Sequence, residues 1–127
     1  ISDYNKAINI DPHYASAYYN RGLSKSKLKD YQGAISDYTE AIKIDPNDKS
    51  AYKNRGVTKG KLKDYYGAIS DYNKAIEIDP NDTDLYVNRS IEKDIIGDIE
   101  GACLDAKKAV SLGDKASDNK SWINDNC

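Results

Sequence analysis

The sequence predicts an all-α solenoid in which short helical hairpins stack on one another, and three observations lead to this fold class. The phrase Ile-Asp-Pro recurs at 10–12, 44–46 and 78–80, with the same spacing each time. Residues 15–48 and 49–82 are identical at 25 of 34 aligned positions. Within each unit the apolar residues follow helical spacing. A fixed period of about 34 residues is typical of repeat proteins, whose units bury their apolar faces against their neighbours.

The first segment, 1–14, corresponds to the second half of a unit. Its opening Ile1-Ser-Asp-Tyr recurs at Ile35 and at Ile69. We therefore expect residues 1–14 to form the second helix of a truncated repeat, and the chain to be a piece of a longer protein.

Each full unit is expected to contain two helices. In the unit 15–48, two helical runs are separated at Lys29-Asp30, and the second ends before Pro46, because proline restricts the residue that precedes it. Asp48 then offers a side chain suited to the N-cap of the following helix. The next unit, 49–82, repeats this pattern, so both are predicted to be helical hairpins.

The third unit, 83–114, is expected to be a degenerate terminal repeat. It departs from the pattern at Ser90, Ala106 and Asp114, where the earlier units have Gly, Tyr and Pro. Terminal repeats of solenoids are often atypical because they face solvent or a cap. The segment 115–127 has one apolar stripe among polar residues, and we expect it to form a capping helix.

Small, aromatic and proline residues stand at fixed places in the unit: Ala17, Tyr18, Gly22, Leu28, Tyr31, Ala34, Tyr38, Ala41 and Pro46. In its residue types and in the length of its unit, this pattern resembles the tetratricopeptide repeat (TPR). Tyr18 stands where that family often has Trp, and Tyr38 where it often has Phe. The resemblance implies a right-handed superhelical solenoid of TPR hairpins that serves as a non-enzymatic protein-protein interaction module.

Asn20, Asn54 and Asn88 stand at the same place in the first helix of their units. In the family that the sequence resembles, first helices line a concave groove, and peptide-binding members use asparagines at these places to bond the backbone of an extended peptide. A carboxamide is suited to this because it both donates and accepts hydrogen bonds. The alternative is that the three asparagines cap or brace the helices of the repeat itself, and the sequence leaves both roles open.

The same helix face carries further candidate peptide-binding residues: Tyr19, Lys27, Lys53, Lys61 and Asp84. The three lysines make the expected groove basic in its early part, whereas Asp84 and Asp94 make it acidic later. A ligand with an acidic and a basic stretch would suit this change of charge.

Family members that grip a C-terminal carboxylate use a Lys and an Asn in one unit, an Asn in the next, and a Lys and an Arg in the third. The corresponding residues here are Tyr19, Leu23, Asn54, Asp84 and Asn88. Only Asn54 fits, so the sequence predicts against such a carboxylate clamp.

An arginine follows each asparagine, and an aspartate recurs at a constant distance after it: Arg21 and Asp37, Arg55 and Asp71, Arg89 and Asp105. An arginine could bind a carboxylate of a ligand. The common period of the two residue types favours internal ion pairs instead.

The composition excludes several function classes. His13 is the only histidine, and no glycine-rich phosphate loop is present, so we expect no enzyme, no cofactor and no metal site. A net charge of −2 gives no electrostatic signature of nucleic-acid binding. No apolar run reaches membrane-spanning length, which argues against direct membrane insertion.

The expected partner is therefore a protein or peptide segment. The alternative function is a structural scaffold that self-associates through the exposed ends of the solenoid. Its motivation is the N-terminal edge, where Tyr4, Ala7 and Ile8 would offer apolar surface for a homo-oligomer.

Cys103 and Cys127 lie at similar distances on either side of a turn expected near Asp114. Two antiparallel helices folded at that turn would bring the thiols side by side, so they form either a disulfide or two buried thiols. A disulfide would imply an oxidising compartment. Without one, the cytoplasm is favoured, and the sequence does not identify the location further.

Overall fold

The computed structural model describes residues 1–127, apart from the side chain of Ser117. The described chain forms eight α-helices and no strand, which confirms the all-α fold class. The helices are α1 (Ser2–Ile10), α2 (Ala15–Lys27), α3 (Tyr31–Ile44), α4 (Lys49–Lys61), α5 (Tyr65–Ile78), α6 (Thr83–Ile95), α7 (Ile99–Ser111) and α8 (Ser117–Asn126).

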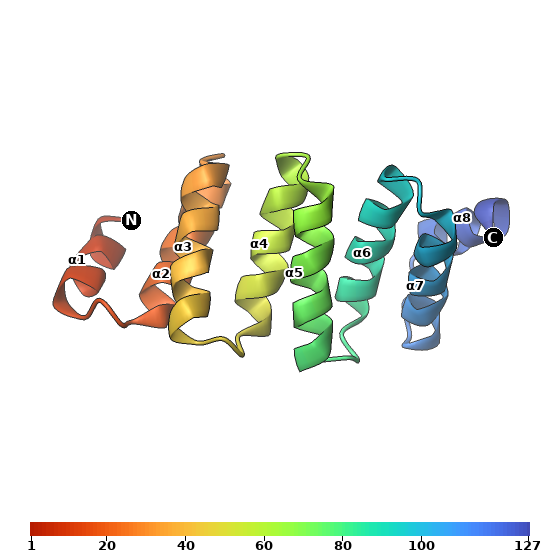
Figure 1. Ribbon diagram of the computed structural model, residues 1–127. Helices are drawn as coiled ribbons and strands as arrows, with labels where there is room; N and C mark the ends of the chain where they lie inside the picture. The colour runs from red at the N-terminus through yellow and green to blue at the C-terminus, as the bar shows by residue number, and fades with distance from the viewer.

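The helices form an elongated row of hairpins with the two termini at opposite ends (Figure 1). The three complete hairpins are α2–α3, α4–α5 and α6–α7, and each packs on the next through α3–α4 and α5–α6. The first helices also contact one another, α2 with α4 and α4 with α6, whereas the contacts between neighbouring second helices are weaker. The first helices therefore line the inner side of the solenoid.

Aspartates begin the second helix of every hairpin. The carboxylates of Asp30, Asp64 and Asp98 accept hydrogen bonds from the backbone N–H three residues later, at 2.9–3.0 Å. These bonds satisfy amide donors that a helix N-terminus otherwise leaves unpaired. Asp48 and Asp82 cap α4 and α6 in a similar way, as the sequence predicts for Asp48.

The core of the first two hairpins depends on a pairing of glycine with tyrosine. A Cβ atom on Gly22 would lie 2.7 Å from the ring of Tyr38, and one on Gly56 would lie 2.8 Å from the ring of Tyr72. Both rings are about 1% exposed. These glycines recur with the period, and the aromatic ring is what requires the space beside them.

The third hairpin replaces both members of that pairing. Ser90 stands at the glycine position and Ala106 at the tyrosine position, and both are buried. The Ser90 hydroxyl donates a hydrogen bond to the carbonyl of Ala102 at 3.1 Å. A side chain fits at residue 90 because the ring that would exclude it is absent, so the two departures from the repeat pattern compensate each other.

The predicted arginine–aspartate pairs are confirmed in all three hairpins. Each guanidinium binds both carboxylate oxygens of its aspartate at 2.6–2.9 Å. A lysine four residues after each arginine lies 3.0–3.1 Å from the same carboxylate. Because the aspartates are only 2–4% exposed, these paired cations supply the partners that a buried carboxylate needs.

The helix α8 packs on α7 at the C-terminal end. In the structure, Cys103 of α7 and Cys127 are joined by a disulfide that closes a loop across the turn between the helices. The Asn119 side chain donates hydrogen bonds to the Asp114 carboxylate at 2.8 Å and to the Ala106 carbonyl at 3.4 Å. The cap is thus attached at both of its ends.

Candidate functional site

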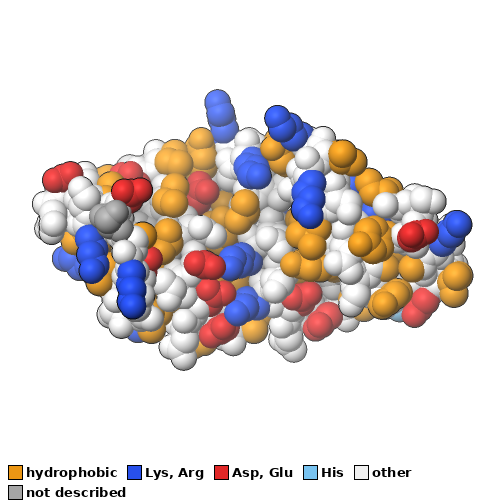
Figure 2. All heavy atoms as spheres, turned by 180° about the vertical axis from the view of Figure 1, so that it is seen from behind, with side chains coloured by type: hydrophobic (Ala, Val, Ile, Leu, Met, Phe, Trp, Pro, Cys, Tyr) orange, Lys and Arg blue, Asp and Glu red, His pale blue; other side chains and the backbone are white. Residues whose placement is uncertain are grey.

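The inner face of the solenoid is built from α2, α4, α6 and α8. Figure 2, which views the molecule from behind, shows apolar side chains along this side interspersed with side chains of both charges. Asn20, Asn54 and Asn88 lie at corresponding places in α2, α4 and α6, and all three are partly buried. The helical register therefore gives the three carboxamides equivalent positions along one face.

Asn54 and Asn88 differ in their surroundings. The amide of Asn54 donates a hydrogen bond of 2.7 Å to the hydroxyl of Tyr19, which joins the first repeat to the second. Asn88 instead lines a pocket between α4 and α6. Burial raises the pKa of Tyr19, so its phenol keeps its proton at neutral pH. Asn54 therefore has a bracing contact, and one donor and its carbonyl remain for another partner.

Two of the charged candidates bind each other. The ammonium of Lys53 lies 3.1 Å from the Asp84 carboxylate and 3.8 Å from that of Asp82. The ammonium of Lys61 lies 5.5 Å from the centre of the Tyr31 ring, within the range of a cation–π contact. Because Lys53 and Asp84 offset each other, the change from basic to acidic along the groove is smaller than the sequence suggests. Lys27 lies at the C-terminal end of α2.

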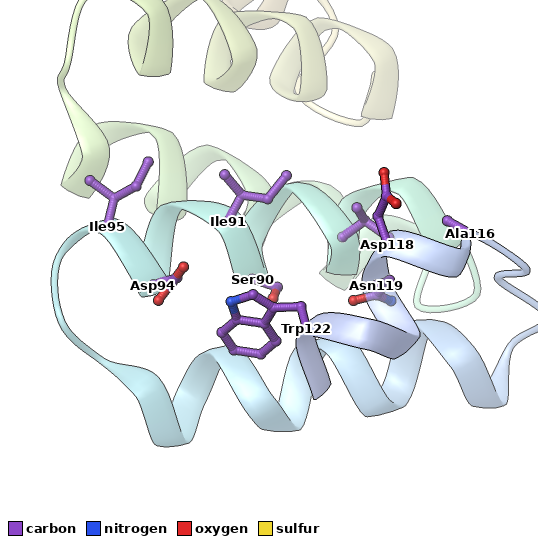
Figure 3. A pocket seen from close by; sticks show the side chains of 9 residues that line it. Ser90, Ile91, Asp94, Ile95, Ala116, Asp118, Asn119 and Trp122 are labelled. Carbon is purple, nitrogen blue, oxygen red and sulfur yellow. The ribbon is translucent and has the colours of Figure 1, made fainter. Parts of the chain in front are cut away.

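An apolar pocket of about 270 Å³ lies between α6 and α8 (Figure 3). Val87, Ile91 and Ile95 line it from α6, and Trp122 lines it from α8. Figure 3 shows the indole of Trp122 beside Ser90, with Asp94 nearby on α6. Ile91 and Ile95 are 52% and 53% exposed, so the pocket leaves apolar surface open to a partner.

A second pocket, of about 240 Å³, lies between α4 and α6, and Ile91 belongs to both pockets. Its other lining residues include Gly60, Asn88 and Glu92. Burial raises the pKa of the Glu92 carboxyl. Neither this carboxyl nor Trp122 belongs to the sequence-predicted site. Glu92 lies in the third unit, whose departures from the repeat pattern are the signal that points to it, whereas Trp122 lies in the capping segment 115–127.

The inner face combines hydrogen-bonding side chains with two adjoining pockets. Among the residues that the structure describes, no group of three His, Cys, Asp or Glu side chains is placed to hold a metal ion. None of the described helices is both long and apolar enough to cross a membrane. The face offers carboxamides, which can bond a peptide backbone, beside pockets that can accept side chains.

A family model for the tetratricopeptide repeat matches residues 15–48 and 50–82. No curated protein gives a significant match.

Solved structures share the fold at low sequence identity. The first TPR of Spaghetti (RPAP3), bound to the HSP90 peptide SRMEEVD, is 23% identical with a TM-score of 0.82, and the alignment covers 87% of this chain and 88% of that one. The Arabidopsis OM64 TPR domain is 24% identical with a TM-score of 0.82, covering 87% and 92%. MamA is 19% identical with a TM-score of 0.90, covering 94% and 70%.

Proposed function

This chain belongs to the tetratricopeptide repeat family, a family of protein-interaction modules, and from that premise we propose that it binds an extended peptide segment along the inner face of its solenoid. The observation that carries the proposal is the pair of adjoining pockets that α4, α6 and α8 form around Ile91. Successive side chains of an extended segment point to opposite sides. Such a segment can place alternate side chains in a row of pockets.

The carboxamides supply the sequence-independent part of this recognition. Asn88 lies at the wall of the α4–α6 pocket, and Asn54 keeps one amide donor and its carbonyl beyond its bond to Tyr19. One net hydrogen bond contributes about 0.5–1.5 kcal/mol. Three asparagines therefore fix the register of a peptide, and most of the affinity has to come from side chains in the pockets.

The ligand differs in chemistry from the acidic SRMEEVD peptide that the RPAP3 domain binds. In the third repeat this chain presents Asp84, Asp94 and Glu92 on the inner side. Asp84 is paired with Lys53, but Asp94 and Glu92 would repel an acidic peptide. We therefore propose a segment that carries an apolar anchor for the α6–α8 pocket.

Trp122 gives a direct test, because it is the single tryptophan of the chain and lines the α6–α8 pocket. Peptides are first selected from a phage-displayed library of random dodecapeptides. We expect a selected peptide to shift the Trp122 emission to shorter wavelength and to lose affinity for an Ile91→Ser variant. A matched control is Leu104→Ser, since Leu104 is exposed on α7. Failure to select any peptide, or equal binding by both variants, contradicts the proposal.

A second candidate function is self-association through the N-terminal edge. No residue of α1 is buried, and Ile10 is 85% exposed. Exposed apolar surface of this kind favours association. Light scattering over a range of concentrations tests it: a mass that rises with concentration, and falls back in an Ile10→Ser variant, supports the scaffold, and a constant monomer mass excludes it.

A further inference from the structure

Glu92 is a buried carboxylate that lacks a full set of partners. Its side chain is in α6, at the interface with α4, and the residue is 9% exposed. Among the described residues, its Oε2 atom is buried and has no hydrogen-bond partner. An ionised group in such a place is costly unless another group pairs with it. Packing within the described chain therefore does not explain this carboxylate, which remains open to a partner from outside.

The corresponding interface between α2 and α4 has no such group. There the equivalents of Gly60 and Glu92, one period earlier, are Ser26 and Thr58. Thr58 is 2% exposed, and its hydroxyl donates to the Asn54 carbonyl at 2.8 Å. In the second unit the polar group at this position therefore has a hydrogen-bond partner, whereas in the third unit one carboxylate oxygen has none among the described residues.

The glycine at 60 makes room for the carboxylate. A Cβ atom on Gly60 would lie 2.5 Å from Oε1 of Glu92. The two substitutions relative to the first interface therefore act together, because the larger acidic side chain fits only where its neighbour has none. The space that remains beside them is the α4–α6 pocket of about 240 Å³.

We propose that the α4–α6 pocket takes a basic side chain, Lys or Arg, of the segment bound in the groove, and that Glu92 pairs with its charge. This inference rests on the proposed function. The apolar walls of Val57 and Ile91 suit the aliphatic part of a Lys or Arg side chain. The Asn88 carbonyl supplies a further acceptor at the wall, and charge-assisted hydrogen bonds of this kind are the stronger ones.

Lys61 is the competing cation, because it also lines the pocket. Its ammonium, however, lies over the Tyr31 ring, and the Oε2 atom of Glu92 has no partner among the described residues. Should Lys61 be the true partner, a Lys61→Gln variant will be destabilised and will bind basic peptides no better. With a ligand cation as the partner, the same variant binds them more tightly, because a repelling charge is removed.

The first experiment compares two selections from the random dodecapeptide library. One uses the unmodified chain, and the other uses the double variant Gly60→Ser/Glu92→Thr, which copies the residues of the α2–α4 interface and so keeps a packing that this fold already contains. We expect Lys or Arg to be enriched at one fixed position with the unmodified chain, and to lose that enrichment with the variant while the apolar anchor stays.

The outcomes separate this inference from the proposed function. Peptides with an anchor but no basic position, or with a basic preference that the variant retains, overturn the inference and leave peptide binding intact. A selection that yields no peptide at all overturns both.

Calorimetry then measures the pairing itself. The selected peptide and its copy with norleucine at the basic position are titrated into the unmodified chain and into Glu92→Gln. We expect norleucine to weaken binding to the unmodified chain on the order of tenfold and to change binding to Glu92→Gln much less. Equal losses in both proteins would show that the basic residue binds elsewhere, and would overturn the assignment to Glu92.

Discussion

The first two repeats and the third repeat use one backbone arrangement with different polar and aromatic side chains. In the first two, Gly22 and Gly56 lie under tyrosine rings, and the buried Thr58 hydroxyl donates a hydrogen bond to the Asn54 carbonyl of its own helix. The third has Ser90 and Glu92 in the corresponding places, with a buried carboxylate oxygen that has no partner among the described residues. The divergent repeat borders both pockets, and the second repeat lines only the α4–α6 pocket, through residues such as Val57, Gly60 and Tyr72.

The comparison separates two kinds of polar residue. Those that recur with the period, such as the Arg55–Asp71 pair, bind within their own hairpin and hold it together. Glu92 breaks the period, and its buried Oε2 atom has no hydrogen-bond partner among the described residues. Local departures from an otherwise consistent pattern are expected at functional sites. We therefore propose that the recurring ion pairs hold the fold together, and that recognition combines the recurring Asn54 and Asn88 with residues that break the period.

The largest expected effect concerns the scaffold. Arg55→Ala leaves the Asp71 carboxylate, whose side chain is 3% exposed, without its bidentate partner. Lys59 still pairs with this carboxylate at 3.1 Å, so we expect the free energy of unfolding to fall by about 3 kcal/mol, the lower end of the loss typical of a broken buried pair. Urea denaturation followed by circular dichroism measures it.

The matched control is Lys74→Ala, which removes an exposed pair with Glu77 on α5. Exposed pairs contribute at most about 1 kcal/mol. A similar loss in both variants would mean that the periodic arginine is not a structural residue.

The next effect concerns the cap of the divergent repeat. The Cys103–Cys127 disulfide spans a sequence separation of 24 residues, and a cross-link of that length stabilises by about 3 kcal/mol in the chain-entropy model. We propose that reduction lets α8 detach, so that the emission of Trp122 moves to longer wavelength. A Cys103→Ser/Cys127→Ser variant is expected to show that emission with or without reductant. Two free thiols in the unfolded, unreduced protein would contradict the bridge.

A smaller effect is expected from the packing of glycine against tyrosine, which the third repeat replaces with serine and alanine. Gly56→Ala forces a Cβ atom against the Tyr72 ring, and overpacking of a core costs about 1–3 kcal/mol. The pair Gly56→Ser/Tyr72→Ala recreates the Ser90 and Ala106 combination. We expect Gly56→Ser to lower the stability of the fold more when Tyr72 is present than in the Tyr72→Ala background. Thermal unfolding of the unmodified chain, the two single variants Gly56→Ser and Tyr72→Ala, and the double variant checks this. Additive losses of stability would show that the glycine and the ring are not coupled.

The smallest expected effect is a gain in stability rather than a loss, and it concerns Glu92. Glu92→Thr is expected to stabilise the free protein at pH 7 by about 1–2 kcal/mol, because it removes a buried acceptor without a partner. Burial raises the pKa of Glu92 in the folded state, so the folded state binds the proton more tightly than the unfolded state does. The unmodified chain therefore loses stability as the pH rises from the pKa of the unfolded state to that of the folded state. The gain from Glu92→Thr therefore shrinks in acid. Denaturation of both proteins at pH 7 and at pH 4 measures the gain in stability at each pH. An equal gain at the two pH values argues against an ionised Glu92 at pH 7.

Features that recur with the period could be predicted from the sequence. The helical hairpins and the Arg21–Asp37 type of pair follow from residues that repeat together, because each copy supports the same local geometry. The left-handed backbone of Lys29 and Lys63, with φ of 63°, was not predicted, since lysine carries no signal for it. Gly97 occupies the same position in the third unit, where the residue type fits the conformation.

The pockets could not be predicted, because they depend on residues far apart in the chain. Gly60 and Glu92 meet only when α4 packs beside α6, and Trp122 lines the same pocket as Ser90 only when α8 folds back. The bond from Asn54 to Tyr19 likewise joins two repeats. Treating each departure from the period as a candidate site would have pointed to Glu92, though not to its partner.

The measurement that tests the proposed recognition most directly is a titration of the ¹⁵N-labelled chain with a library-selected peptide, followed by amide chemical shifts. We predict that the largest changes cluster at Asn88, Ile91, Glu92 and Trp122, around the two pockets of the divergent repeat. Changes centred instead on α2 and α3, with those four amides unmoved, would contradict it.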